Sequence, residues 1–202
     1  MIFYRLIFKV MYKSSINIKF DVDSYPSIVV LAQNKIGWQN LIRLSSEAHL
    51  QTPNGEPAHI SLNQLSSYSE GLIVLSGGPE GLLGALVLSG NDQEALNTCQ
   101  HLAKLFPNRF YIELMRHGME TEELTEDAFL YLAYELDLPL IATNNVYFGP
   151  KEKFQAHDAL MCISSGSHID DKNRKRLTAN HYFKSALDMI ELFKDLLLIS
   201  QR

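Results

Sequence analysis

The sequence predicts an α/β fold, because short segments of strand character alternate with longer segments of helical character. Residues 27–31 (SIVVL), 71–76 (GLIVLS) and 110–114 (FYIEL) are rich in the β-branched and aromatic residues that favour strands. The segments between them carry apolar residues at spacings of three and four, which is typical of a helix with one buried face. Such alternation indicates βαβ units around a parallel sheet, either in a barrel or in an open arrangement.

The amino terminus has a pattern of its own. Residues 1–12 (MIFYRLIFKVMY) are strongly apolar but are interrupted by Arg5 and Lys9. The segment is too short to span a bilayer, and its charges argue against a secretion signal. Its side chains alternate weakly with a period of two, which suits a strand. We therefore expect a cytoplasmic chain without a membrane contact.

Cap and turn residues divide the next part of the chain. Asn34 and Ser61 are of the residue types that cap the amino termini of helices, and residues 51–58 (QTPNGEPA) are rich in turn formers. The elements expected here are a strand at 27–31, a helix from Asn34 to about His49, a short helix from Ser61 through Leu65, a strand at 71–76, and a glycine-rich turn that enters a short helix.

The clearest amphipathic helix opens at Asn91 and is ended by Pro107. Its expected buried face consists of Ala95, Leu96, Cys99, Leu102, Ala103 and Phe106. The elements expected after it are a strand at 110–114, a helix at 121–136, a strand at 138–142, a helix at about 151–163, a basic loop, and a final helix at about 185–197.

The composition is that of an ordinary globular protein. Apolar residues make up 46% of the 202 residues and charged residues 20%, with a formal net charge of −5. A negative balance argues against broad adhesion to nucleic-acid backbones, which needs clustered Lys and Arg. Cys99 and Cys162 lie far apart in apolar surroundings, so we expect two buried thiols in a reducing compartment.

Several stretches recur together, in the same order, in one protein family. The resemblance is to the PHP domain, named for polymerase and histidinol phosphatase, of the alpha subunit of bacterial DNA polymerase III, and it covers about residues 21–197. The matching stretches are 30–50 (VLAQNKIGWQNLIRLSSEAHL), 71–78 (GLIVLSGG), 109–118 (RFYIELMRHG), 138–148 (LPLIATNNVYF), 156–171 (AHDALMCISSGSHIDD) and 181–193 (HYFKSALDMIELF).

The resemblance implies a fold and a division of the chain. The fold would be an incomplete, PHP-type distorted (β/α)7 TIM-like barrel, followed by a C-terminal helical segment leading towards the polymerase core. Residues 1–20 would be an unmatched segment, residues 21–165 a partial PHP domain, and residues 166–202 a connector. A barrel that lacks its opening units leaves an unpaired strand edge, so we expect marginal stability or self-association.

The resemblance also points to a metal site that has degenerated. Family members with an intact site hold Zn, Mn or Mg ions on His, Asp, Glu and sometimes Cys side chains, and these ions cleave phosphodiesters. This chain has no His before His49, so the family's opening His-x-His segment is missing. His117 stands where the family has a histidine ligand, Gly78 stands where some members have a cysteine, and Asn145 and Tyr147 replace an Asp and a His. These four are expected to be vestigial positions, with no catalytic residue and no bound cofactor.

Residues 172–176 contain the one basic run of the chain, formed by Lys172, Arg174, Lys175 and Arg176. A solvated loop is the simpler interpretation of such a run. Contact with DNA phosphate or with a partner is the alternative, and any DNA contact would be weak or indirect.

Three functions remain open from the sequence. The first is a non-catalytic scaffold: a fragment of the alpha subunit, without the polymerase palm, that packs against the polymerase module and replisome subunits. The second is a free-standing interaction module that binds a replication protein. The third is an enzyme, a metal-dependent phosphoesterase whose site has been rebuilt around His117. The chain resembles part of a DNA-directed DNA polymerase, which is a nucleotidyltransferase, but this chain alone is expected to be catalytically inactive.

Overall fold

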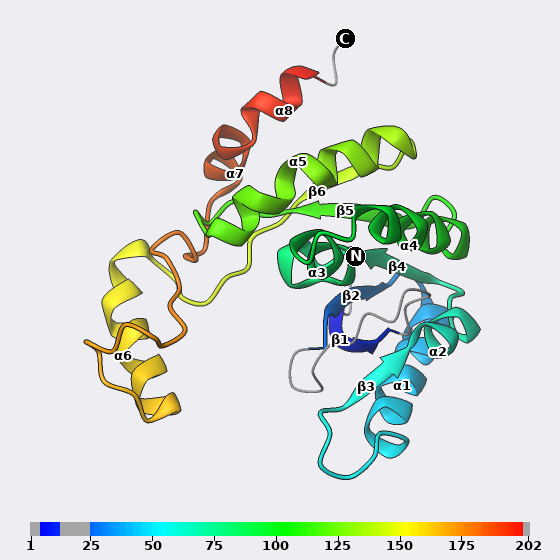
Figure 1. Cartoon of the computed structure of the whole chain (residues 1–202), viewed down its shortest axis with the longest axis horizontal. Helices are drawn as coiled ribbons and strands as arrows, with labels where there is room; N and C mark the ends of the chain where they lie inside the picture. The colour runs from blue at the N-terminus through cyan, green and yellow to red at the C-terminus, as the bar shows by residue number, and fades with distance from the viewer. Residues whose placement is uncertain (1–4, 13–24, 200–202) are drawn as a thin grey trace. The chain divides into compact units, whose positions relative to one another are not determined.

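A computed structural model describes residues 5–12 and 25–199 of the chain, and these divide into two compact units. Unit 1 combines Met1–Glu113 with Leu124–Ile141, and unit 2 combines Leu114–Glu123 with Ala142–Arg202. Figure 1 shows the elements of both units along the chain. Each unit is described by itself below.

Six strands of the described residues form one mixed sheet in the order β3-β1-β2-β4-β5-β6. Their bounds are β1 Arg5–Met11, β2 Ser27–Ala32, β3 His59–Ser61, β4 Leu72–Leu75, β5 Phe110–Leu114 and β6 Leu140–Ala142. The α/β class predicted from the sequence is therefore confirmed, and so is the strand expected within residues 1–12. Strand β3 was not predicted.

The directions of the strands correct the expectation of a parallel sheet. β1 and β3 are parallel, as are β4 and β5, but β2 runs antiparallel to both of its neighbours, β1 and β4. An apolar run identifies a strand that is buried on both faces but carries no information about its direction. Among the described strands no pairing joins β3 to β6, so closure into a barrel stays a prediction.

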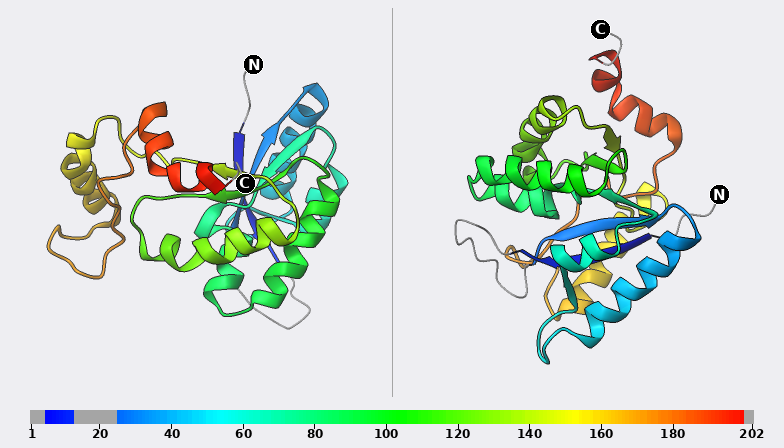
Figure 2. Two further views of the ribbon diagram at one scale, coloured as in Figure 1. Left: turned by 90° about the horizontal axis from the view of Figure 1, so that it is seen from above. Right: turned by 90° about the vertical axis from the view of Figure 1, so that its right-hand side faces the viewer.

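The core of unit 1 surrounds β2. Ile28, Val29 and Val30 are all at most 3% exposed. Because successive side chains of a strand point to opposite faces, both faces of the sheet must be covered there. Figure 2 shows α1 on one face of these strands and α4 on the other.

Helices α1 and α2 of unit 1 begin where their cap residues predict. The Asn34 side chain accepts a hydrogen bond from the Gly37 N–H, and Ser61 forms a reciprocal capping box with Gln64. The helices are α1 Lys35–Leu50, α2 Leu62–Ser67, the 3-10 turn η2 Gly78–Glu80, α3 Leu82–Leu88, α4 Asp92–Leu105 and α5 Glu120–Glu135, whose first turn belongs to unit 2.

The buried face of α4 contains two polar residues that the apolar pattern omits. Glu94 and Thr98 are 6% and 4% exposed, whereas Leu96 and Ala103 of the predicted face are only half-buried. The Tyr12 hydroxyl donates to Glu94 Oε1 at 2.7 Å and lies 2.8 Å from Thr98 Oγ1. This distant tyrosine satisfies both polar groups, which is why burying them is tolerated.

Unit 2 contains the 3-10 turn η3 Lys151–Lys153 and the helices α6 Phe154–Ser165, α7 Ala186–Leu192 and α8 Lys194–Ile199. The prediction of a single helix at 185–197 is wrong, because the helix is interrupted at Phe193. In a continuous helix the Leu192 carbonyl would accept from the Leu196 N–H. Instead Arg116 Nη1 donates to that carbonyl at 2.8 Å, and Leu196 N–H bonds to Phe193 O.

The two compact units do not follow the boundaries at residues 20 and 165 implied by the resemblance. Those boundaries stay a prediction about how the chain aligns with its family. None of the helices in the described part of the chain is long and apolar enough to cross a membrane.

Candidate functional site

The structure brings three of the four predicted vestigial positions into unit 2. His117 follows β5, and Asn145 and Tyr147 lie in the loop 143–147 that follows β6. Gly78 lies in unit 1, where it is buried at the start of η2 with a φ of 60°. The candidate site is therefore built around His117 within unit 2.

The turn that carries His117 is closed by a glutamate at the start of α5. Glu122 Oε2 accepts hydrogen bonds from the backbone N–H groups of His117, at 2.6 Å, and Met119, at 3.1 Å. Glu122 Oε1 lies 2.6 Å from His117 Nδ1. A glutamate in the first turn of a helix often reaches back to the preceding backbone N–H groups in this way.

The electrostatics of this pair favour an ionised carboxylate. Burial alone would raise the pKa of Glu122, but the hydrogen bond from the His117 side chain and those from the two backbone N–H groups outweigh it, and the pKa is lowered. Glu122 is therefore an acceptor at neutral pH, and His117 Nδ1 carries the proton between them.

The second ring nitrogen of His117 also has protein partners. The backbone N–H of Asn145 points to Nε2 at 3.2 Å, and the side-chain oxygen of Asn144 lies 3.0 Å from the same atom. A neutral ring accepts from Asn145, and a doubly protonated ring donates to Asn144. Nε2 thus has a partner in either protonation state.

A second histidine covers the first. The rings of His117 and His181 stack with their centroids 4.2 Å apart, and the Tyr147 ring meets His181 edge-on at 5.6 Å. His181 is 4% exposed. Burial lowers the pKa of His181, and the His117 ring beside it adds to this shift whenever it is protonated, so the neutral form of His181 is favoured at pH 7.

The carbonyl of His117 is held as well. Thr178 Oγ1 donates to it at 2.5 Å, and Asn180 Nδ2 donates at 3.2 Å. The turn around His117 is thereby tied to the segment that precedes α7.

This arrangement does not fit the metal cluster that the family implies. Both ring nitrogens of His117 are engaged by protein groups, so a metal ion would have to displace Glu122 or the Asn145 N–H. Asn145 offers an amide and Tyr147, 43% exposed, a phenol, in place of the carboxylate and imidazole ligands that such cations prefer. Within the ranges that the structure describes, no three His, Cys, Asp or Glu side chains are grouped to hold a metal ion.

The basic loop lies elsewhere in unit 2. Arg174 forms a two-point ion pair with Asp158 at 2.6 Å, and its side chain is only 5% exposed. The pair lowers the pKa of Asp158. Arg176 is exposed and donates to the Ile169 carbonyl at 2.9 Å. Arg174 is thus unavailable to phosphate, and a DNA contact, which stays a prediction, would depend on Arg176 and the exposed Lys172 and Lys175.

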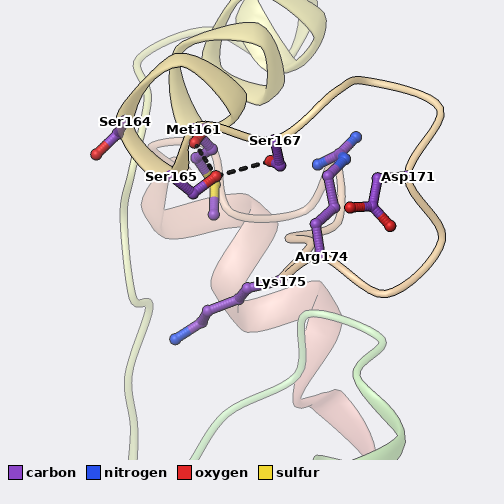
Figure 3. A pocket seen from close by; sticks show the side chains of 7 residues that line it. All are labelled: Met161, Ser164, Ser165, Ser167, Asp171, Arg174 and Lys175. Carbon is purple, nitrogen blue, oxygen red and sulfur yellow. Dashed lines mark hydrogen bonds between the residues drawn. The ribbon is translucent and has the colours of Figure 1, made fainter.

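A pocket of about 360 Å³ opens between this loop and the end of α6 (Figure 3). Lys175 points away from the Arg174 guanidinium, and Asp171 adds a negative charge to the lining. Because Arg174 is already paired with Asp158, and Asp171 offsets the charge of Lys175, the pocket makes at most a weak anion site. The lining residues are Met161, Ser164, Ser165, Ser167, Asp171, Arg174 and Lys175.

Sequence reasoning missed the residues that complete the cluster. Glu122 was visible only as an acidic residue in the first turn of a helix, which is a common position for solvent-exposed carboxylates. His181, Asn144 and Lys184 follow no ligand spacing, and only the fold brings them to His117.

Comparison with known proteins gives one family and a consistent set of relatives. Residues 3–117 match the PHP domain family, so the match begins within the segment 1–20 that shows no resemblance by inspection. The DNA polymerase III subunit alpha of Rickettsia conorii is 39% identical over 181 residues, and that of Caulobacter vibrioides is 41% identical over 171 residues. These alignments cover 90% and 85% of this chain but 15% of each relative. The chain therefore spans about 15% of the length of the relatives it matches.

Proposed function

The chain belongs to the PHP domain family, and from that premise we propose that it serves DNA replication as the PHP region of a DNA polymerase III alpha subunit. The observation that carries this proposal is the identity of 39% and 41% to two such subunits over 85% or more of the chain. Its role there is that of a non-catalytic scaffold for the polymerase module.

Two features of unit 2 support a scaffold. The His117 ring is occupied by Glu122 and Asn145, an arrangement that serves packing rather than hydrolysis. The helices also expose large apolar side chains in pairs spaced three residues apart, so that each pair shares a helix face. These are Leu160 and Ile163 on α6, 62% and 77% exposed, and Leu187 and Ile190 on α7, 77% and 55% exposed. Such surfaces suit contact with another polypeptide.

The scaffold role is tested by supplying the chain in trans. The alpha subunit of Rickettsia conorii is truncated by the 181 residues that align with this chain. The truncated subunit is then purified alone and in the presence of this chain. We expect the two to co-elute in size-exclusion chromatography. Ile163→Asp should weaken the association about tenfold or more, as for an anchor residue of an interface. Ser164→Asp, which places the same charge on the neighbouring exposed residue, should have a much smaller effect.

Failure of the wild-type chain to associate would overturn the scaffold role. The enzymatic alternative has its own measurement, which is hydrolysis of a phosphomonoester and of single-stranded DNA in the presence of Mn²⁺ or Zn²⁺. We expect no turnover above that of the His117→Ala variant. A rate that is lost with this substitution would instead assign the chain to the phosphoesterases.

A further inference from the structure

Lys184 places a cationic group beside the His117 cluster. Its ammonium donates to the Asn180 carbonyl and, at 3.1 Å, to the side-chain oxygen of Asn144. It also lies over the Tyr182 ring, 4.9 Å from the centroid. Carbonyl oxygens and an aromatic face are the surroundings that a cation prefers in a partly buried site.

The ammonium determines how Asn144 is oriented. Lys184 can only donate, so the amide oxygen of Asn144 must face it, and the amide nitrogen is left to donate to the Tyr182 carbonyl at 2.9 Å. In this orientation the same oxygen lies 3.0 Å from His117 Nε2. Lys184 is therefore linked to His117 by a single side-chain amide, that of Asn144.

The ammonium has carboxylates near it as well as one other cation. Burial lowers the pKa of Lys184, the negative charges of Glu122 and Asp188 oppose that shift, and the charge of Lys151 adds to it. Glu122 is the carboxylate that binds His117 from the other side. The cluster thus contains an anion and a cation of the protein's own, with His117 and Asn144 between them.

We infer that the Lys184 ammonium takes the place of a bound metal cation in this cluster, so that the loop 143–147 keeps its position without a metal ion. By the resemblance, this loop is the one that carries two metal ligands in family members with an intact site. Here its backbone is held by protein groups instead, through the bonds from Asn145 N–H to His117 Nε2 and from Tyr147 N–H to the His181 carbonyl. The inference concerns the internal structure of unit 2 and does not depend on the scaffold role.

Amide hydrogen exchange of the full chain, followed by NMR, tests this at two sites. Lys184→Met removes the ammonium but keeps an unbranched apolar side chain, and Lys184→Arg keeps the charge. We expect Lys184→Met to speed exchange at the Asn145 and Tyr147 amides about tenfold, as for loss of one hydrogen bond to a charged group. Lys184→Arg should change these rates much less. Lys172→Met, at an exposed lysine, should leave them unaltered.

The second part of the experiment measures the effect of metal ions on the same amides. Neither a chelator nor added Zn²⁺ should change the two exchange rates in the wild-type chain, and added Mn²⁺ should not broaden the resonances of residues 143–147. Slower exchange with Zn²⁺, or unchanged rates in Lys184→Met, would overturn the inference. If Lys184→Met fails to fold, Lys184→Arg and the metal titrations of the wild-type chain still decide it.

Discussion

Replacing Arg116 by methionine removes the guanidinium contacts that hold the break between α7 and α8. The guanidinium pairs with Asp195 at 2.7 and 2.8 Å, donates to the Leu192 carbonyl at 2.8 Å, and lies 4.8 Å from the centroid of the Phe193 ring. Without it, the Leu192 carbonyl is free to accept from the Leu196 N–H. We expect the two short helices to fuse into one.

The magnitude follows from the exposure of each partner. The Asp195 side chain is 55% exposed, so the ion pair contributes only about 0.5 kcal/mol. The bond to the Leu192 carbonyl, a half-buried residue, contributes roughly 1 kcal/mol and the contact with the Phe193 ring about 0.5 kcal/mol. Because these contacts share one side chain and are not independent, we expect their loss to lower the free energy of unfolding of the chain by about 2 kcal/mol.

Two measurements check this prediction. Backbone chemical shifts at Phe193 report whether it becomes helical, and exchange of the Leu196 amide reports whether its hydrogen bond moves to Leu192. Arg116→Lys is the matched control, because it keeps the charge but cannot hold the carboxylate and the carbonyl together, so it should fall between wild type and Arg116→Met. If Phe193 stays non-helical in Arg116→Met, the break has another cause and the reasoning is wrong.

Three further predictions concern stability, measured by urea unfolding. Glu122→Gln should destabilise the chain by about 2 kcal/mol, because the bonds to His117 lose their charged acceptor, whereas Glu123→Gln at an exposed position should cost less than about 0.5 kcal/mol. Stability should fall as the pH is lowered, because folding depresses the pKa values of His181 and Glu122. The contribution of His181 to stability is lost as the pH falls below its ordinary pKa of 6.5, and that of Glu122 as the pH falls below its ordinary pKa of 4.5. Urea-unfolding midpoints that stay constant from pH 7 to 4 would contradict both assignments. Gly77→Ala should destabilise by roughly 2 kcal/mol or more, since its φ is 88° and a β-carbon would lie 2.7 Å from a backbone oxygen. Gly90→Ala, with a φ of 72° but open space around it, should cost only about 1 kcal/mol, and equal effects would refute the steric argument.

Local signals account for what the sequence predicted well. Asn34 and Ser61 begin helices because the side chain of each satisfies a backbone N–H group three residues away, and no distant contact is required. The apolar run 27–31 marked β2 through its composition, because a strand buried on both faces needs apolar residues on both of its sides.

The features that were missed depend on residues far apart in the chain. At the break at Phe193, the preceding carbonyl of Leu192 accepts a hydrogen bond from Arg116, which lies far away in the sequence. Glu94 is buried on α4 because Tyr12 reaches it. In the candidate site, His117 was found by resemblance, but its partners Asn144 and Lys184 have residue types that carry no functional signal by themselves.

The division into two units has a consequence for dissecting the chain. The polypeptide passes from one unit to the other at residues 113, 123 and 141, and α5 begins in one and ends in the other. Neither unit is a continuous stretch of sequence, so no simple truncation isolates either of them. A fragment that starts after residue 141 would lack Leu114–Glu123, and with it the histidine and the glutamate around which unit 2 is organised.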